Sequence, residues 1–247
     1  LHESNAVPGR ANRLLARWAD EILFGLEDAR ERIGHPSVHQ TGTPVRTEFR
    51  EINTETSRAK LGFEAKKSVV LIIGGSQGAR GLNELIAAAL PNLPEAQWMH
   101  LAGPHDFDAM KTAHRKNRLK TVVHEFFDDM PTALGAADLV ISRAGASSLA
   151  ELTAAGKPAV LVPLPGSADD HQRANARAAA KGGGAVVFEQ DGAPVKFAEM
   201  VAGLLGDSAK LQSMAEAMKR LDRPDAASEI ARRILVACEE RAVDSSG

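Results

Sequence analysis

Short aliphatic runs alternate with longer amphipathic stretches through most of the chain. This alternation predicts βα units that build a parallel sheet covered by helices. Leu82, Leu85, Ile86 and Ala89 recur at helical spacing, which predicts a helix behind the first strong strand. The predicted strands are 69–73, 97–101, 121–126, 139–142, 159–163 and 185–188. Such a set is enough for one doubly wound α/β domain.

The two ends of the chain differ from this middle part. Beyond Pro194 the pattern is helical, with predicted helices at 195–205, 208–221 and 225–240. Before residue 45 the chain predicts one clear helix (11–18) and two short strands (21–24 and 38–41), too few to close a sheet. We therefore expect the end of an earlier α/β domain of a longer protein. The predicted division is 1–45 for that N-terminal domain, 46–66 for a hydrophilic linker, 67–224 for the main domain, and 225–247 for a C-terminal helix and tail.

Composition and charge exclude several classes of protein. The chain has 247 residues, of which 44% are hydrophobic and 25% charged, and this is ordinary globular composition. Its net charge of −2 shows no basic excess, so we expect no nucleic-acid partner. The single cysteine, Cys238, excludes an internal disulfide and a cysteine-based zinc finger. The longest aliphatic run, Val69–Ile73, is far shorter than a membrane span requires.

A glycine-rich turn follows the first strong strand and precedes a helix. Gly74, Gly75 and Gly78 allow close backbone approach to a ligand, and a helix start offers unpaired N–H groups to an anion. The turn matches neither the P-loop nor the dinucleotide-binding spacing. It is therefore either a phosphate site or only a tight connection between strand and helix.

A second small-residue turn, at 142–151, also has two interpretations. Ser147 or Ser148 could cap the following helix, with Glu151 completing a capping box. Alternatively, the serine hydroxyls and backbone N–H groups hold a diphosphate while Glu151 accepts hydrogen bonds from ribose. The spacing leaves both interpretations open.

A third turn, at 163–176, leads from a strand into a polar helix. Gln172 and Asn175 lie three residues apart on one face, and their amides suit sugar hydroxyls, although a solvated helix face is the plainer interpretation. All three turns follow strands of one predicted sheet, and ligands of open α/β sheets bind at the carboxyl edge. Together the turns favour a nucleotide-type site.

Other residues with candidate chemistry have simpler explanations. The eight histidines show no metal-ligand spacing, so we expect no metal. Asp128 and Asp129 precede a predicted helix, where acidic residues are favoured by the helix dipole, and we do not expect them to be catalytic.

An ordered set of motifs resembles one family. The motifs are Leu-His-Glu-Ser-Asn at 1–5, Gly-Thr-Pro-Val-Arg at 42–46, Gly-Gly-Ser-Gln-Gly-Ala at 74–79, Glu-Phe-Phe-Asp-Asp-Met at 125–130, Arg-Ala-Gly-Ala-Ser at 143–147, the segment 151–156, and His-Gln-Arg-Ala-Asn-Ala at 171–176. As a set they resemble the MurG family of bacterial N-acetylglucosamine transferases. The resemblance implies a GT-B fold, in which two Rossmann-like domains face each other across a cleft. It also implies inverting transfer of N-acetylglucosamine from UDP-N-acetylglucosamine to lipid I, giving lipid II for peptidoglycan, without a cofactor.

The resemblance further implies which residues meet the nucleotide. Arg46 and Ser76, with the neighbouring Gln77, would contact the donor diphosphate, and the backbone of Phe127 would recognise the uracil edge. Glu151 would hold the ribose. The residues expected to border the nucleotide and its phosphates are Ala146, Ser147, Ser148, Leu149 and Ala150.

Other roles concern the sugar, the acceptor and the membrane. Gln172 and Asn175 would select N-acetylglucosamine, and Asn5 would lie at the donor cleft. The family's Gly-Gly-Thr-Gly-Gly-His loop, whose histidine is a candidate base, does not occur in this sequence, so no catalytic residue is assigned. The resemblance places acceptor and membrane contacts mostly in the N-terminal domain of the family, and implies a peripheral protein at the cytoplasmic side of the bacterial inner membrane. Two alternatives remain: a nucleotide-sugar-binding fragment that is inactive alone, and a related UDP-sugar transferase with another acceptor.

Overall fold

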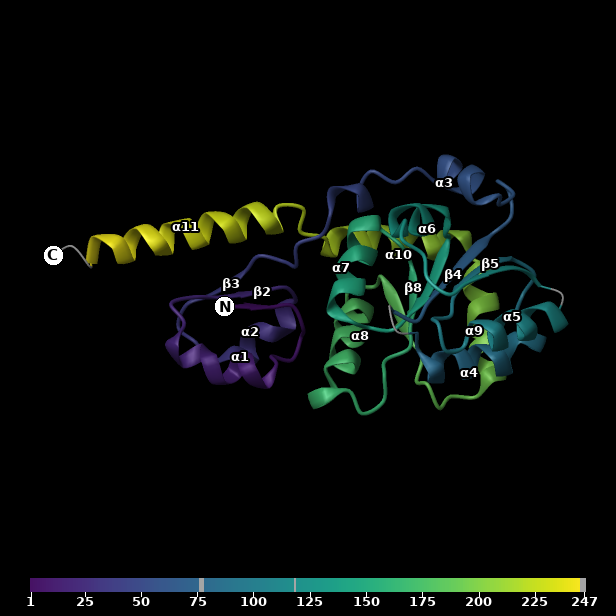
Figure 1. Cartoon of the computed structure of the whole chain (residues 1–247), viewed down its shortest axis with the longest axis horizontal. Helices are drawn as coiled ribbons and strands as arrows, with labels where there is room; N and C mark the ends of the chain where they lie inside the picture. The colour runs from purple at the N-terminus through teal and green to yellow at the C-terminus, as the bar shows by residue number, and fades with distance from the viewer. Residues whose placement is uncertain (76–77, 118, 245–247) are drawn as a thin grey trace.

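The computed structural model describes residues 1–75, 78–117 and 119–244. Its strands form two parallel sheets, one of three strands and one of six (Figure 1). The α/β class predicted from the sequence is therefore confirmed. Among the residues that the structure describes, no helix is long and apolar enough to cross a bilayer.

The six-stranded sheet has the order β6-β5-β4-β7-β8-β9. Counted from its first strand this is 3-2-1-4-5-6, the doubly wound order, with the switch point between β4 and β7. The strands are β4 (Val69–Ile73), β5 (Gln97–Leu101), β6 (Lys120–His124), β7 (Leu139–Ser142), β8 (Ala159–Leu161) and β9 (Ala185–Val187). Three of them have the bounds predicted from the sequence, whereas β6 ends two residues before the predicted 126.

Helices cover both faces of this sheet because its central strands are buried on both sides. Along β4, Val69 and Leu71 join one apolar cluster, and the intervening Val70 joins the other. Residues of α6 (Met130–Ala136), α7 (Ala146–Ala155) and α8 (His171–Lys181) contribute to the first cluster. Residues of α4 (Arg80–Ala89), α5 (Phe107–Lys116) and α9 (Pro194–Leu205) contribute to the second. In Figure 1, α7 and α8 lie nearest the N-terminal part of the chain, and α5 lies on the far side.

The N-terminal part contains the small sheet, in the order β1-β2-β3. Its elements are β1 (His2–Glu3), α1 (Arg10–Leu15), β2 (Ile22–Phe24), α2 (Arg30–Ile33) and β3 (Val38–Gln40). The sequence did not predict β1, because two residues give no periodicity. Hereafter "N-terminal part" means residues 1–42.

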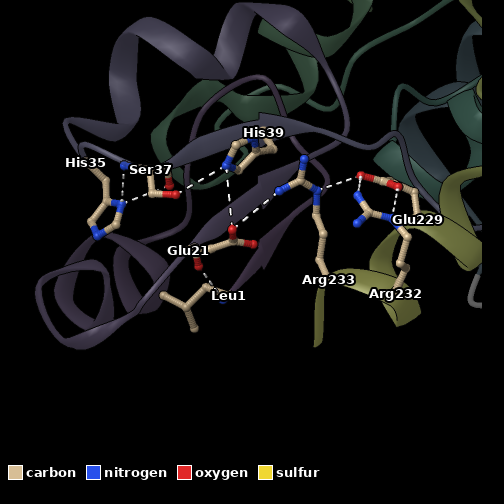
Figure 2. Close-up of polar contacts among 8 residues, drawn as sticks. All are labelled: Leu1, Glu21, His35, Ser37, His39, Glu229, Arg232 and Arg233. Carbon is tan, nitrogen blue, oxygen red and sulfur yellow. Dashed lines mark hydrogen bonds and ion pairs between the residues drawn. The ribbon is translucent and has the colours of Figure 1, made fainter. Parts of the chain in front are cut away.

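The C-terminal helix α11 (Ala226–Asp244) leaves the large domain after α10 (Ser208–Leu221) and runs beside the small sheet (Figure 1). Figure 2 shows what fixes it there: Arg233 lies 3.3 Å from Glu21, which precedes β2, and 2.7 Å from Glu229 on its own helix. Cys238 lines a hollow shared with Leu15 and other residues of the N-terminal part. The helix α11 is therefore attached to the N-terminal part.

The segment between the two sheets is more ordered than its hydrophilic sequence indicates. It contains a 3₁₀ turn at Thr47–Phe49 and the helix α3 (Thr54–Leu61), which packs on α6. Phe49 is buried in the core of the large domain. The side chain of Asn53 caps α3 by accepting a hydrogen bond from the N–H of Thr56. The division into domains at residues 45, 66 and 224 stays a prediction.

Candidate functional site

The three polar turns lie at one edge of the large sheet. They follow β4, β7 and β8, which are consecutive neighbours in a parallel sheet, so their carboxyl ends meet at the same edge. The turns after β4 and β7 flank the switch point, from which α4 and α7 leave toward opposite faces of the sheet. Open α/β sheets bind their ligands at this point. The predicted arrangement of the turns is therefore confirmed.

The turn after β4 needs its glycines. Gly75 and Gly78 have φ values of 86° and 76°, in the left-handed region that favours glycine. A Cβ on Gly78 would lie 2.7 Å from the carbonyl oxygen of Ala102. This is too close for any side chain unless the backbone shifts. The helix α4 starts behind the turn with Ala79 at its N-cap, so no side chain of the described residues caps its first N–H groups. Ser76 and Gln77, assigned to this turn by resemblance, lie outside the described residues.

The turn after β7 shows that the capping-box interpretation is wrong. The N-cap of α7 is Gly145, and no side chain caps the helix. Ser147 and Ser148 are instead the second and third residues of α7 itself, so neither one is at the N-cap position. Since α7 begins at this edge with uncapped N–H groups and an exposed hydroxyl at Ser147, the turn can accept an anion.

The helix α7 presents two different faces. Ala146, Leu149 and Ala150 line a cavity of about 390 Å³ between the N-terminal part and the large domain. Leu149 is only 2% exposed, so its side chain belongs to the core and only its backbone is available to a ligand. Glu151 does not line this cavity, because it points about 100° further around the helix than Ala150.

A carboxylate and a cation lie together on the other side of α7. Burial raises the pKa of Glu151, and the positive charge of Arg46 acts against this rise. Arg46 is exposed, and its guanidinium lies 5.2 Å from the centre of the Phe49 ring. The structure thus places Arg46 close enough to Glu151, in the second turn of α7, for its charge to act on the carboxylate.

The turn after β8 orients Gln172. The Oε1 atom of Gln172 accepts a hydrogen bond of 3.0 Å from the N–H of Leu164, and its own N–H donates to Ser167 Oγ at 3.3 Å. Its Nε2 donates to none of the residues that the structure describes. Gln172 is therefore held in place through its acceptor and keeps two donors for a ligand.

Asn175 has a different environment from Gln172. It is fully buried on α8, and its amide contacts Asn5 and Ala6 of the N-terminal part as well as Ala144. The structure therefore brings Asn5 and Asn175 together, but in a contact between the two parts of the chain.

Phe127 follows β6, two strands away from β4 in the sheet. Its ring packs against the first apolar cluster and lies 5.1 Å from the ring of His124. The Phe127 side chain is thus packed into the protein. Only the backbone of the 125–129 loop is available to contact a ligand there. In the same loop Asp129 lies at the N-terminus of α6, as predicted, and its side chain also caps the helix by accepting from the N–H of Thr132.

Two buried residues near this edge were not foreseen. Arg143 donates to the carbonyl oxygens of Val162 and Pro163 at 3.0 and 3.3 Å and to Gln190 Oε1 at 2.6 Å, so it ties the turn after β7 to the end of β8. Glu3 is buried in the N-terminal part and accepts four hydrogen bonds. Arg143 and Glu3 both lie within the motifs. The partners of Arg143 are distant in sequence and those of Glu3 lie in an irregular loop, so no spacing indicated the role of either residue.

Metal ligands are not clustered at this edge or elsewhere in the described ranges, which contain no group of three or more His, Cys, Asp or Glu side chains able to hold an ion.

A doubly wound parallel domain with polar turns at its switch point, next to a second parallel α/β unit, has the architecture of the GT-B type. Residues 69–230 match the family model described as "Glycosyltransferase family 28 C-terminal domain". The chain belongs to this family.

Comparisons with individual proteins agree. The chain is 37% identical over 235 residues to the UDP-N-acetylglucosamine–N-acetylmuramyl-(pentapeptide) pyrophosphoryl-undecaprenol N-acetylglucosamine transferase of Geobacter sulfurreducens, covering 93% of this chain and 64% of that protein. It is 36% identical to the protein of the same name from Listeria monocytogenes, covering 95% and 66%. The crystal structure of Acinetobacter baumannii MurG superposes with a TM-score of 0.77 at 30% identity, covering 95% and 65%. The resemblance to the MurG family is thus confirmed, and the chain spans slightly less than two thirds of the length of these relatives.

Proposed function

We propose that the complete protein transfers N-acetylglucosamine from UDP-N-acetylglucosamine to lipid I, forming lipid II for peptidoglycan. The observation that carries this proposal is the position of three polar turns at the carboxyl edge of β4, β7 and β8, in a chain that belongs to glycosyltransferase family 28. The names of the relatives from Geobacter sulfurreducens and Listeria monocytogenes describe this transfer and support it.

The chemistry requires a site that stabilises a leaving diphosphate. In an inverting transfer, the acceptor hydroxyl loses its proton to a base and its oxygen bonds to the anomeric carbon. The bond from that carbon to the diphosphate oxygen breaks, and its electron pair leaves with UDP. The uncapped N-termini of α4 and α7 and the guanidinium of Arg46 supply positive potential at the edge where we place this charge. Ser76 and Gln77 keep the role that the resemblance implies for them.

Two side chains on α7 and α8 suit the rest of the donor. Glu151 is half-buried beside Arg46, and we assign its carboxylate to the ribose hydroxyls. Gln172 holds its amide in a fixed orientation with Nε2 free of partners in the described part of the chain, and we assign it to the sugar hydroxyls. The backbone at Phe127 and the segment 146–150 are assigned to uracil and to the nucleotide, as the motifs imply.

Acceptor and membrane contacts are assigned to the portion of the relatives that this chain does not match. We propose peripheral attachment at the cytoplasmic face of the bacterial inner membrane, and no catalytic base is assigned within this chain.

The experiment is an assay of UDP release by the complete protein with UDP-N-acetylglucosamine and a lipid I analogue. Release that depends on both substrates supports the proposal, and a folded protein that releases no UDP contradicts it. The same assay with the 247-residue chain tests the alternative that this part alone binds donor without turnover. A Gln172→Ala variant of the complete protein should lose preference for UDP-N-acetylglucosamine over UDP-galactose-type donors, and an unchanged preference would contradict the role of Gln172.

A further inference from the structure

Asn175 is the buried centre of a contact between the two parts of the chain. Its side chain is 0% exposed, although it lies only four residues after His171, the first residue of a helix that begins at the ligand edge. Its Oδ1 accepts from the N–H of Ala6 at 2.8 Å, and its Nδ2 donates to Asn5 Oδ1 and to the carbonyl oxygen of Ala144, both at 3.0 Å. Both donors of the amide are used inside the protein, so a sugar hydroxyl could reach Asn175 only by displacing one of these partners.

The direction of these hydrogen bonds is fixed by their partners. The N–H of Ala6 can only donate and the carbonyl of Ala144 can only accept, so the amide of Asn175 has one possible orientation. The amide of Asn5 is fixed in the same way, because its Nδ2 donates to the carboxylate of Glu3 at 3.0 Å while its Oδ1 accepts from Asn175. The donors therefore run in one direction from α8 to Glu3.

Glu3 anchors this chain of hydrogen bonds in the N-terminal part. Its carboxylate also accepts from the backbone N–H groups of Asn5 and Gly9 and from Asn12 Nδ2, at 2.7–2.9 Å. Burial acts to raise the pKa of Glu3, but the hydrogen bonds outweigh it and the pKa is lowered. An ionised and fully bonded Glu3 keeps the loop that carries Asn5 and Ala6 in one conformation.

A second contact joins the N-terminal part to the large domain at the surface. Asp169, just before α8, forms an ion pair of 2.6 Å with Arg13 of α1, and Arg10 lies 3.6 Å from it. Asp169 and Asp170 have φ values of 50° and 54°, in the left-handed region that favours glycine and that aspartate enters more often than most other residues. The surrounding contacts therefore hold this turn in a strained conformation where the N-terminal part meets α8.

We propose that Asn175 and Asn5 form a clasp that holds the N-terminal part against the turn after β7, and that Asn175 is a positioning residue rather than a sugar ligand. The clasp bears on the site because Ala144 directly precedes Gly145, the N-cap of α7. Loss of the clasp leaves buried polar groups without partners on both sides, so the two parts move relative to each other and the start of α7 is released. The link to donor binding rests on the proposed function, whereas the clasp itself does not.

The first test measures the distance between the two parts in the 247-residue chain. Spin labels are attached to Cys238 on α11, which is fixed to the N-terminal part, and to an Ala109→Cys variant on the exposed face of α5. Asn175→Ala and Asn5→Ala should each shift and broaden the distance distribution, and the double variant should go no further than either single one. The matched control is Arg177→Ala, an exposed position on the same helix, which should keep the wild-type distribution. An unchanged distance distribution in folded Asn175→Ala overturns the clasp. If Asn175→Ala does not fold, an unchanged distribution in Asn5→Ala overturns it.

The second test separates positioning from sugar binding. The same variants are titrated with UDP and with UDP-N-acetylglucosamine. A positioning residue predicts that Asn175→Ala weakens both ligands by the same factor, with their affinity ratio unchanged within about twofold. Weaker binding of UDP-N-acetylglucosamine with unchanged binding of UDP would show direct sugar contact and overturn the assignment. If even the wild-type chain binds neither nucleotide, the proposed function fails at its donor site, and the distance measurement alone decides the clasp.

Discussion

Lowering the pH from about 7.5 to about 5 should destabilise the large domain through two buried histidines, His100 on β5 and His114 on α5. They form a chain of hydrogen bonds in which Thr121 Oγ1 donates to His114 Nδ1 (3.1 Å), His114 Nε2 to His100 Nδ1 (3.0 Å), and His100 Nε2 to Asn83 Oδ1 (3.0 Å). Asn83 fixes this direction, because its Nδ2 donates to the Ala102 carbonyl and its Oδ1 can only accept. Both imidazoles are neutral in this arrangement. A proton added to His100 Nδ1 would face the N–H of His114, and a proton added to His114 Nδ1 would break the hydrogen bond that this nitrogen accepts from Thr121.

The size of the effect follows from the pKa values. Burial lowers the pKa of His100 to about 3, with a further contribution from His114, and burial lowers the pKa of His114 to about 4, against an ordinary value of 6.5. When the pKa of a histidine is lower in the folded than in the unfolded state, only the unfolded state takes up a proton between the two pKa values. The free energy of unfolding is therefore unaffected above the unfolded pKa and falls as the pH decreases toward the folded pKa. At pH about 5 the unfolded histidines are protonated and the folded ones are not, which costs on the order of 2 kcal/mol for each, or about 4 kcal/mol together.

The assay is urea unfolding at both pH values, followed by the fluorescence of buried Trp98 in a Trp18→Phe background. His100→Gln and His114→Gln should each lower the free energy of unfolding at the higher pH but lose less of it on acidification. Met110→Ala, a buried substitution one turn before His114, is the matched control and should retain the full pH dependence. Equal losses in the wild type and in both histidine variants would refute the reasoning.

Three further outcomes are expected from single substitutions. Glu151→Gln should weaken UDP and UDP-N-acetylglucosamine alike by about tenfold, because a neutral amide replaces the carboxylate assigned to ribose; calorimetric titration measures this, and unchanged affinity would remove Glu151 from the site. Asp129→Ala removes the cap of α6 at Thr132 and should lower the free energy of unfolding by about 1 kcal/mol in urea, whereas no loss would show that the cap does not stabilise the fold. Gly78→Ala forces a Cβ against the Ala102 carbonyl at positive φ. It should lower the free energy of unfolding by about 1–3 kcal/mol in the same urea assay and should also weaken donor binding. Wild-type stability would contradict the tight turn.

The sequence predicted the large domain well because its strands are buried on both faces. Runs such as Val69–Ile73 and Leu139–Ser142 are continuous and aliphatic, and the turns between strand and helix are marked by glycine. The hydrophilic stretch 46–66 misled because α3 has little apolar character of its own and packs largely through its position on α6. The strand β1 was not predicted because its two residues show no hydrophobic pattern, and it is a strand only through its pairing with β2.

The candidate site was predictable only in part. The turns after predicted parallel strands indicated that Gln172 and Glu151 belong to helices that begin at one edge of the sheet, and the structure has both helices there. The environment of Asn175 depends on Asn5, 170 residues away, and no local spacing encodes such a contact. The capping box at Ser147 failed for a local reason, because Gly145 takes the N-cap position and moves both serines inside the helix.

The central claim, that this chain carries the donor site of a family 28 glycosyltransferase, is tested most directly by calorimetric titration of the 247-residue chain with UDP-N-acetylglucosamine. UDP and GDP serve as the comparison ligands. We predict saturable binding of one molecule of UDP-N-acetylglucosamine, binding of UDP at the same site, and at least tenfold weaker binding of GDP, roughly a 1.4 kcal/mol difference. A folded chain that binds UDP-N-acetylglucosamine no better than GDP would contradict the account.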